Sequence, residues 1–446
     1  MKYSFLFMLC CAVGVMGQER SMTLGDCIQT GIANNLSLSN ARIEVAKGRT
    51  GVSQSRSRLL PVVQGVFQFT DYLKSPVNVT TGTLLGNDFP EEPTWQTIKS
   101  MPYNANAGIQ LTMPLYNQTL LAAVEVARTV EKIQALSYEK AVEELTMQIG
   151  KVYYWAQTAQ AQMRLSEENI RRMETLCEIT EALYQQGVVM EVDLNRARIN
   201  LQGLQAQQDQ FQTLYAQQLH MLKWLLNIDA DTPLEVVRMA DRVDHVMPPT
   251  GVSQGLPELR LAERQKELAD RQIRTVRAGY LPSLSLTGYA GAIGYQTHFD
   301  HFFHTHAASD NWFGNCYLAL SIRIPLFEAN AKRLQIRQYR FATQQAANRI
   351  EWTQKQLDER YHHALLQWTH NLEVFQTQSE SYRQAEAVYN VTEEQYKEGV
   401  SSMTALLQDE MQLRAAQAAC VQAHCQCNLA RLDLLRLAGQ LEQLSR

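Results

Sequence analysis

The sequence predicts a mixed α and β protein, mostly made of long α-helical coiled-coil hairpins, with four membrane-spanning β-strands in each chain. Three observations lead to this fold class. The chain repeats itself after roughly 210 residues. Each copy holds two alternating segments of about ten residues, the length of a transmembrane strand. Each copy also holds a stretch of roughly 70 residues nearly free of proline and glycine, which favours unusually long helices.

Three pairs of similar segments recur in the same order in the two halves of the chain. The pairs are SRLLPVVQGVFQF (57–69) with AGYLPSLSLTGYA (278–290), GIQLTMPLYNQ (108–118) with LALSIRIPLFEAN (318–330), and YQQGV (184–188) with YKEGV (396–400). Three shared landmarks in one order indicate a duplicated unit. We therefore predict one repeat over residues 18–228, a second over 257–446, and a linker over 229–256.

Apolar and polar residues alternate in the four strand-like segments, as they do in strands whose two faces meet different surroundings. The strands are expected at about 61–73, 103–114, 281–291 and 315–325. In the second of these, for example, Ile109 and Leu111 alternate with Asn106 and Gln110. A soluble β-sandwich has the same alternation. Nothing else in the chain looks strand-like enough for a second sheet, so we favour strands that cross a bilayer.

The two proline-free stretches, residues 115–186 and 326–398, predict helices far longer than the average of about 12 residues. Their apolar positions recur at three- and four-residue spacings, which predicts packing side by side as coiled coils. Gly187 and Gly399 are expected to end the long helices and let the chain turn back. Shorter helices are expected near 24–59, 193–226, 257–278 and 404–438, and irregular connections at 75–102, 229–256 and 290–315.

The N-terminus and the composition narrow the class of protein. Residues 1–17 contain Lys2 followed by an apolar run and predict a secretory signal peptide, with lipidation at Cys10 or Cys11 as the alternative. A net charge of -4 gives no basic surface for nucleic acid.

Four strands cannot close a barrel, and an open sheet edge cannot face hydrocarbon, so membrane-spanning strands require several chains.

The landmarks resemble those of the TolC family of outer-membrane efflux proteins. The matching motifs are MTLGDCIQTGIANNLSL (22–38), the Leu-Pro pairs at 60–61 and 281–282, the exits MPLY (113–116) and IPLF (324–327), the two Tyr-x-x-Gly turns, and LARLDLLRLAGQL (429–441). They cover essentially the whole chain after the signal peptide. The resemblance implies a homotrimer, with a twelve-stranded β-barrel in the outer membrane of a Gram-negative bacterium continued by a twelve-helix α-barrel in the periplasm.

The same resemblance implies the function of an exit channel in a tripartite efflux or type I secretion system. Its partners would be a periplasmic adaptor (membrane fusion protein), an inner-membrane pump and outer-membrane lipid, with no nucleic acid. A trimeric coiled-coil tether or adhesin anchored in the outer membrane is the alternative function. The chain contains no Gly-x-Ser-x-Gly, His-Glu-x-x-His or phosphate-binding glycine loop, so we predict neither an enzyme nor a bound cofactor.

Candidate site residues follow from the resemblance, which implies the docking turns and a pore constriction, and from one local histidine cluster. The turns imply adaptor docking at Gly187, Val188, Gly399 and Val400. A pore constriction is expected among polar residues after the turns, where a ring of carboxylates favours cations, although plain surface solvation is the alternative; the candidates are Asp193, Gln408, Asp409 and Glu410. Weak metal-binding candidates are His298, His301, His304 and His306, but we favour contact of the neighbouring phenylalanines with a barrel rim.

Overall fold

The computed structural model describes residues 20–81, 95–240, 251–302 and 312–445, and the predicted signal peptide lies outside them. The chain divides into two compact units. We call the first the tip unit, because it contains both glycine turns; it comprises Met1–Val45, Ile133–Glu263 and Asn348–Arg446. We call the second the sheet unit; it comprises Ala46–Lys132 and Arg264–Ala347.

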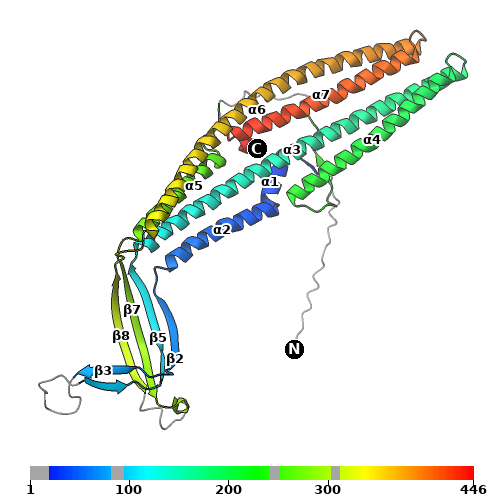
Figure 1. The fold of residues 1–446 in the computed structure, drawn as a ribbon. Coiled ribbons are helices and arrows are strands. Elements are labelled where there is room, and N and C mark those ends of the chain that lie inside the picture. The colour runs from blue at the N-terminus through cyan, green and yellow to red at the C-terminus, as the bar shows by residue number, and fades with distance from the viewer. Residues whose placement is uncertain (1–19, 82–94, 241–250, 303–311, 446) are drawn as a thin grey trace, which may run out of the picture. The chain divides into compact units, whose positions relative to one another are not determined.

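Helices make up most of the described chain, and two of them are exceptionally long. They are α1 (Leu24–Asn34), α2 (Leu36–Ser57), α3 (Gln118–Gln185), α4 (Glu191–Leu226), α5 (Pro257–Ala278), α6 (Ala331–Lys397) and α7 (Met403–Leu437), with short 3₁₀ turns at Phe299–Phe302 and Leu441–Ser445. With 68 and 67 residues, α3 and α6 are the long helices that the proline-free stretches predict. Each is followed by a turn and a shorter return helix, α4 or α7 (Figure 1). None of the described helices is apolar enough over a sufficient length to cross a membrane.

Asn35 divides the helix that was expected at 24–59 into α1 and α2. Its side-chain oxygen accepts hydrogen bonds from the backbone N–H groups of Ser37 (2.9 Å) and Leu38 (3.2 Å), which caps the start of α2. Its side-chain amide donates to the carbonyl of Leu225 at the end of α4 (2.9 Å). The break is therefore stabilised by a contact 190 residues away in sequence, which no local pattern indicates.

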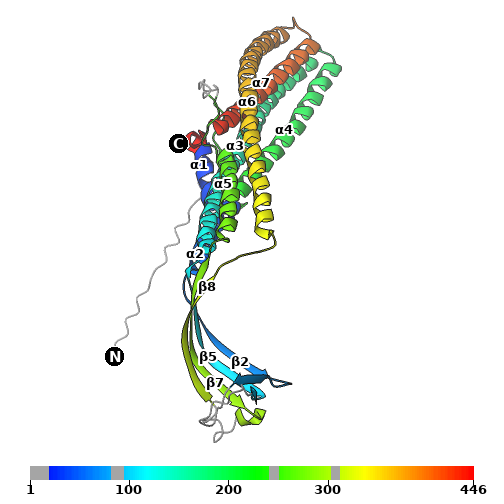
Figure 2. The ribbon, with the colours of Figure 1, turned by 60° about the vertical axis from the view of Figure 1, so that its left-hand side comes forward.

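The sheet unit contains a four-stranded antiparallel sheet in the order β2-β5-β7-β8 (Figures 1 and 2). Its strands are β2 (Val62–Asp71), β5 (Tyr103–Tyr116), β7 (Ser283–Gln296) and β8 (Trp312–Arg323). The central pair joins the two sequence repeats, with Gln110 of β5 opposite Tyr289 of β7. Strand β7 extends to Gln296, inside the connection expected at 290–315, because its residues pair with β5 on one side and β8 on the other.

The two faces of this sheet differ in chemistry. One face, which we call the apolar face, presents Val63, Phe67, Ile109, Leu111, Leu284, Leu286, Leu318, Leu320 and Ile322. The other, the polar face, presents Gln64, Gln68, Asn104, Asn106, Gln110, Thr112, Ser285, Thr287, Asn315 and Ser321. Large residues of the apolar face such as Phe67 and Leu318 are exposed in the single chain. A sheet with one exposed apolar face and one polar face has the pattern of a membrane barrel wall.

Four short strands that the sequence did not indicate lie outside the main sheet and form two two-stranded pairs. Strand β1 (Arg20–Met22) pairs in parallel with β6 (Leu234–Val236), and β3 (Val77–Thr81) pairs antiparallel with β4 (Trp95–Lys99). They fall in the expected connections at 75–102 and 229–256 and beside the N-terminus. Strands of three to five residues are too short to show a period. Their pairing is decided by tertiary contact.

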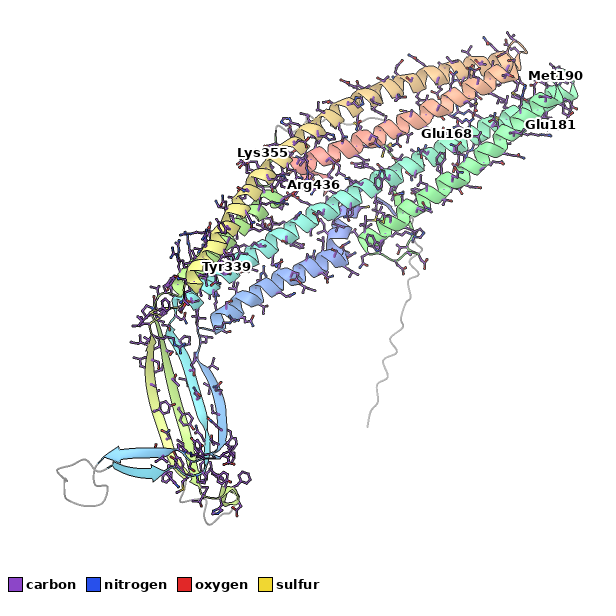
Figure 3. All side chains as sticks on the ribbon, in the orientation of Figure 1. Glu168, Glu181, Met190, Tyr339, Lys355 and Arg436 are labelled. Carbon is purple, nitrogen blue, oxygen red and sulfur yellow. The ribbon has the colours of Figure 1, made fainter. Side chains whose placement is uncertain are left out.

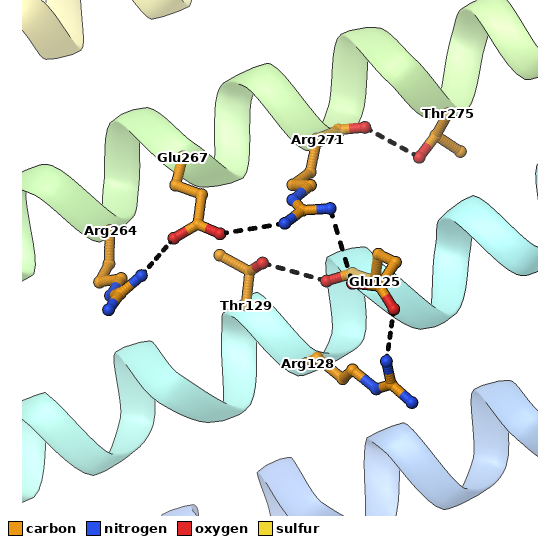
Figure 4. Close-up of polar contacts among 7 residues, drawn as sticks. All are labelled: Glu125, Arg128, Thr129, Arg264, Glu267, Arg271 and Thr275. Atoms are coloured by element: carbon orange, nitrogen blue, oxygen red, sulfur yellow. Dashed lines mark hydrogen bonds and ion pairs between the residues drawn. The ribbon is translucent and has the colours of Figure 1, made fainter.

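Ion pairs link α5 to the start of α3 within the sheet unit (Figure 4). The Arg271 guanidinium lies 3.5 Å from a carboxylate oxygen of Glu125 on α3 and 3.4 Å from one of Glu267 on its own helix. Glu267 also pairs with Arg264 at 2.6 Å. The hydrogen bond from the Arg264 side chain is the main cause that holds the pKa of the Glu267 carboxyl below its usual range. These groups are well solvated, so the pairs orient the helices more than they stabilise them.

Candidate functional site

Gly187 ends α3 in a left-handed conformation, with a φ of 74°. Its N–H group donates to the carbonyl of Tyr184 (2.9 Å), and the next N–H group, that of Val188, donates to the carbonyl of Leu183 (2.9 Å). These two bonds define a Schellman motif, which satisfies carbonyl groups that the helix leaves without partners. Met190 follows in the same turn, with Glu181 nearby on α3 (Figure 3).

Gly399 ends α6 in the same way, with a φ of 76°. It donates to the carbonyl of Tyr396 (3.0 Å), and Val400 donates to that of Gln395 (2.8 Å). A Cβ atom added at either glycine would meet nothing within 4 Å. The backbone conformation, not a lack of space, therefore explains why both turns use glycine.

The return helices begin differently in the two turns. Ser402 caps α7, since its hydroxyl accepts from the N–H of Ala405 (3.2 Å), whereas Met190 at the same place before α4 makes no side-chain cap. Both turns expose a valine to solvent: Val188 is 61% exposed and Val400 is 74% exposed. Each turn thus presents an exposed valine directly after its glycine.

A common hydrophobic core lies beneath the two turns, and it contains residues of α3, α4, α6 and α7. Its buried members are Met173, Leu176, Ala197, Leu204, Tyr389, Tyr396, Met403, Leu406, Leu407 and Leu413. A buried contact between the hydroxyls of Thr180 and Tyr396 (3.2 Å) connects α3 to α6. An exposed contact from Arg196 to Thr404 (3.4 Å) connects α4 to α7. The two hairpins are therefore packed together at this end of the tip unit.

Glu410, a constriction candidate, is buried among these helices. It is 5% exposed, and one of its carboxylate oxygens lies 2.8 Å from the Arg414 side chain one helical turn away. Burial raises the pKa of the Glu410 carboxyl above its usual range, against the opposing effect of the Arg414 charge. In this conformation its carboxylate lies inside the helix packing.

The other three candidates occupy different surroundings. Asp193 pairs with Arg196 at 3.1 Å in the first turn of α4. Asp409 accepts a hydrogen bond from the Thr392 hydroxyl of α6 (2.7 Å), and Gln408 is exposed. Adjacent helical positions point in different directions, so the four candidates do not form one group within a single chain.

Sequence reasoning missed a buried polar contact between α3 and α7. The side-chain amide of Asn169 donates to the side-chain oxygen of Gln417 (2.9 Å), and Arg172 donates to Asn169 (3.0 Å). Asn169 and Gln417 are both buried. The sequence did contain a signal for this contact, because Asn169 and Gln417 each occupy a position that is otherwise apolar in the coiled-coil pattern. Polar residues at such positions can fix the register of paired helices.

The histidine cluster falls largely outside the described residues. His304 and His306 lie outside them, the side chain of His301 is not described, and His298 is exposed beside the Thr297 hydroxyl (3.1 Å). Among the described residues no group of three or more His, Cys, Asp or Glu side chains could hold a metal ion.

Two aromatic side chains beside the histidines, Phe299 and Phe302, pack against one end of the sheet. Phe299 packs edge-on against Phe69 of β2 (5.2 Å between ring centroids), and Phe302 packs against Phe69 and against Trp312 of β8 (5.8 and 6.0 Å). Tyr103 of β5 completes the group, 6.2 Å from both Phe69 and Phe299. Phe69 and Tyr103 belong to the apolar face. An aromatic group at one end of an apolar sheet face is typical of a membrane-water interface.

The chain belongs to the outer membrane efflux protein family, which matches residues 27–227 and 252–440. The toluene efflux pump outer membrane protein TtgC of a Pseudomonas putida strain is 24% identical over 406 residues, or 89% of this chain and 79% of the relative. The antibiotic efflux pump outer membrane protein ArpC of Pseudomonas putida matches to the same extent. The family that the motifs suggested is thereby confirmed, and with it the outer membrane as location.

Solved structures support the fold. The Campylobacter jejuni outer membrane channel CmeC has a TM-score of 0.73 and 17% identity, covering 95% of this chain and 89% of that one. The Neisseria gonorrhoeae outer membrane channel MtrE, in its open state, has a TM-score of 0.72 and 20% identity, covering 94% and 89%. The predicted mixed fold of long helical hairpins with a four-stranded sheet in each chain is confirmed.

Proposed function

We propose that the chain is the outer-membrane exit channel of a tripartite efflux pump and that it works as a homotrimer. The observation that carries this proposal is the four-stranded sheet with one apolar face, one polar face and two edge strands, β2 and β8. An edge strand cannot face hydrocarbon with unpaired backbone groups. Three copies pairing β8 of one chain with β2 of the next would close a twelve-stranded barrel, with the apolar face against lipid.

The two turns form the surface for a periplasmic adaptor under this proposal. Gly187 and Gly399 hold the backbone in matching Schellman motifs, which expose Val188 and Val400. Exposed valines on a rigid turn offer apolar contacts with little loss of side-chain entropy on binding. Met190 adds an exposed apolar side chain to the first turn only, so the two turns would make unequal contacts with the adaptor.

Asp193, Gln408 and Asp409 remain our candidates for the constriction, because they are not buried in the helix core. Three copies of one carboxylate around a narrow opening would favour cations. We assign Glu410 a structural role instead, because its buried side chain pairs with Arg414 in the core between the helices.

The cargo would be small organic compounds, because the relatives are named for the efflux of toluene and of antibiotics. The channel itself catalyses no reaction in this scheme, and the inner-membrane pump supplies the energy. The alternative cargo is protein, which the chain would export as the outer-membrane channel of a type I secretion system.

Reconstitution tests the proposal. The purified full chain should migrate as a trimer, and in planar bilayers it should give a low-conductance, mostly closed channel. A monomer that conducts no current would overturn the proposal. The structural tether or adhesin is separated by a cellular test: a tether keeps its function when the turns are altered, whereas an exit channel with altered turns leaves cells hypersensitive to a pumped compound.

A further inference from the structure

The polar face of the sheet carries two pairs of aromatic rings across β7 and β8. Tyr289 stacks on Tyr317, with 5.6 Å between centroids and 24° between planes. Tyr295 lies beside Phe313, with 6.2 Å and 50°. The register places Tyr289 opposite Tyr317 and Ile293 opposite Phe313, on the same side as Ser285 and Ser321. We call the four aromatic residues the ring pairs.

The first pair, Tyr289 with Tyr317, is built against the wall of the sheet. Tyr289 is 7% exposed, and its hydroxyl donates to the side-chain oxygen of Asn106 on β5. A Cβ atom at Gly108 or at Gly291 would collide with the hydroxyl end of Tyr289, so both glycines make room for it. Tyr289 is thereby fixed along the sheet, and Tyr317 stacks on it while remaining 48% exposed.

The ring pairs stand in an uncharged surface. On the polar face, the four described strands carry one charged residue. It is Arg323, the last residue of β8. The other side chains of this face are amides, hydroxyls, small residues and a few aliphatic groups, including Ile293 opposite Phe313. Phe313 is 56% exposed within this polar surface. The polar face around the ring pairs has no charge to attract an ion, but its exposed rings can contact another aromatic ring.

We propose that the ring pairs are a binding surface for uncharged, planar aromatic molecules that move along the polar face. The inference rests on the proposed function, in which the polar face lines the channel. Aromatic rings attract one another in offset-stacked and edge-to-face arrangements, and Tyr317 and Phe313 each offer an exposed ring for such contact. They are four residues apart on β8, or about 13 Å, so a molecule that leaves one ring pair can reach the next.

The experiment records single-channel currents of the purified full chain in planar bilayers while 2-naphthol is added. Each bound molecule should interrupt the current briefly. Decahydro-2-naphthol, which has the same skeleton and hydroxyl but no aromatic ring, is the matched probe. This comparison uses the unmodified chain and does not depend on any variant folding. We expect interruptions about fivefold longer with 2-naphthol.

Variants then locate the surface. Tyr317→Ser combined with Phe313→Ser should shorten the 2-naphthol interruptions about fivefold, Tyr317→Phe should preserve them, and Asn315→Ser, on the same face between the two rings, should leave them unchanged. Equal interruptions by the two probes, or by the double variant and the unmodified chain, would overturn the inference. A chain that carries no current at all contradicts the proposed function, whereas normal current without any preference for the aromatic probe contradicts the ring pairs alone.

Discussion

The hydroxyl groups of Thr180 on α3 and Tyr396 on α6 meet at 3.2 Å in a fully buried contact. The Thr180 hydroxyl also donates to the carbonyl of Leu176 (2.8 Å), so the hydrogen between the two hydroxyls belongs to Tyr396. Tyr396 is the tyrosine of the second Tyr-x-x-Gly motif and contributes its carbonyl to the Gly399 turn. One residue therefore serves both the turn and the contact between the two hairpins.

Tyr396→Phe should loosen the packing of the hairpins at the turns. The substitution keeps the ring in the core but leaves the buried Thr180 oxygen without its donor, which costs about 1 kcal/mol. The expected result is a channel that opens more often in planar bilayers. Tyr184→Phe is the matched control, because Tyr184 occupies the same place in the first motif and is exposed. Equal opening by both variants would contradict the importance of the buried contact.

Gly187→Ala should weaken the first turn through its backbone alone. Alanine in the left-handed region costs about 1 to 2 kcal/mol, and the added Cβ atom meets no neighbour. Gly187→Asn should cost less, because asparagine tolerates this conformation better. The measurements are adaptor binding to the purified trimer and sensitivity of cells to a pumped compound, and Gly399 should respond in the same order.

Gly203→Ala is the control for these turn variants. Gly203 lies inside α4, where a Cβ atom also meets nothing and alanine is the better helix former by roughly 1 kcal/mol. We expect unchanged adaptor binding and slightly higher stability. If alanine at position 187 were as harmless as at position 203, the left-handed turn would not be needed for function.

Glu410 should make stability depend on pH. Its carboxyl has a folded pKa raised above the ordinary value of 4.5, so its favourable contribution is complete below that value and is lost as pH rises through the raised pKa. Denaturant unfolding of the unmodified trimer between about pH 4 and pH 7 should therefore show a stability loss that Glu410→Gln reduces.

Gln408→Asn, an exposed neighbour that does not titrate, is the control and should keep the slope of the unmodified chain. A Glu410→Gln variant with the same slope would show that the buried carboxyl is not the source of the pH dependence.

Gly291→Ala should destabilise the sheet, because a Cβ atom there overlaps the Tyr289 hydroxyl and the backbone of β5. Overpacking of this kind costs about 1 to 3 kcal/mol. Gly65→Ala on β2 provides the control, since a Cβ atom at that position meets nothing within 4 Å. The temperature at which the trimer dissociates on a gel should fall for the first variant and not for the second. Equal temperatures would mean that the Tyr289 ring can move aside without cost.

Local sequence patterns were sufficient where the deciding interactions are local. The two-residue period of the strands reflects the alternating direction of their side chains. The absence of proline from α3 and α6 reflects the backbone hydrogen bonds within each helix. The positive φ at Gly187 and Gly399 follows in the same way, because only glycine adopts it readily. These features were readable without knowing what the elements pack against.

Long-range packing decided the rest. Asn35 breaks a helix because Leu225 accepts its amide, and β1 exists because β6 lies beside it. Glu410 looked like a candidate for a pore-lining ring, but the turn of α7 directs it into the core with Arg414. The sequence by itself determined the repeat, the glycine ends of α3 and α6, and the two faces of the sheet. The tertiary structure alone decided which polar side chains are buried and which rings meet on the polar face, because those contacts join different elements, as Asn169 with Gln417 and Tyr289 with Asn106 show.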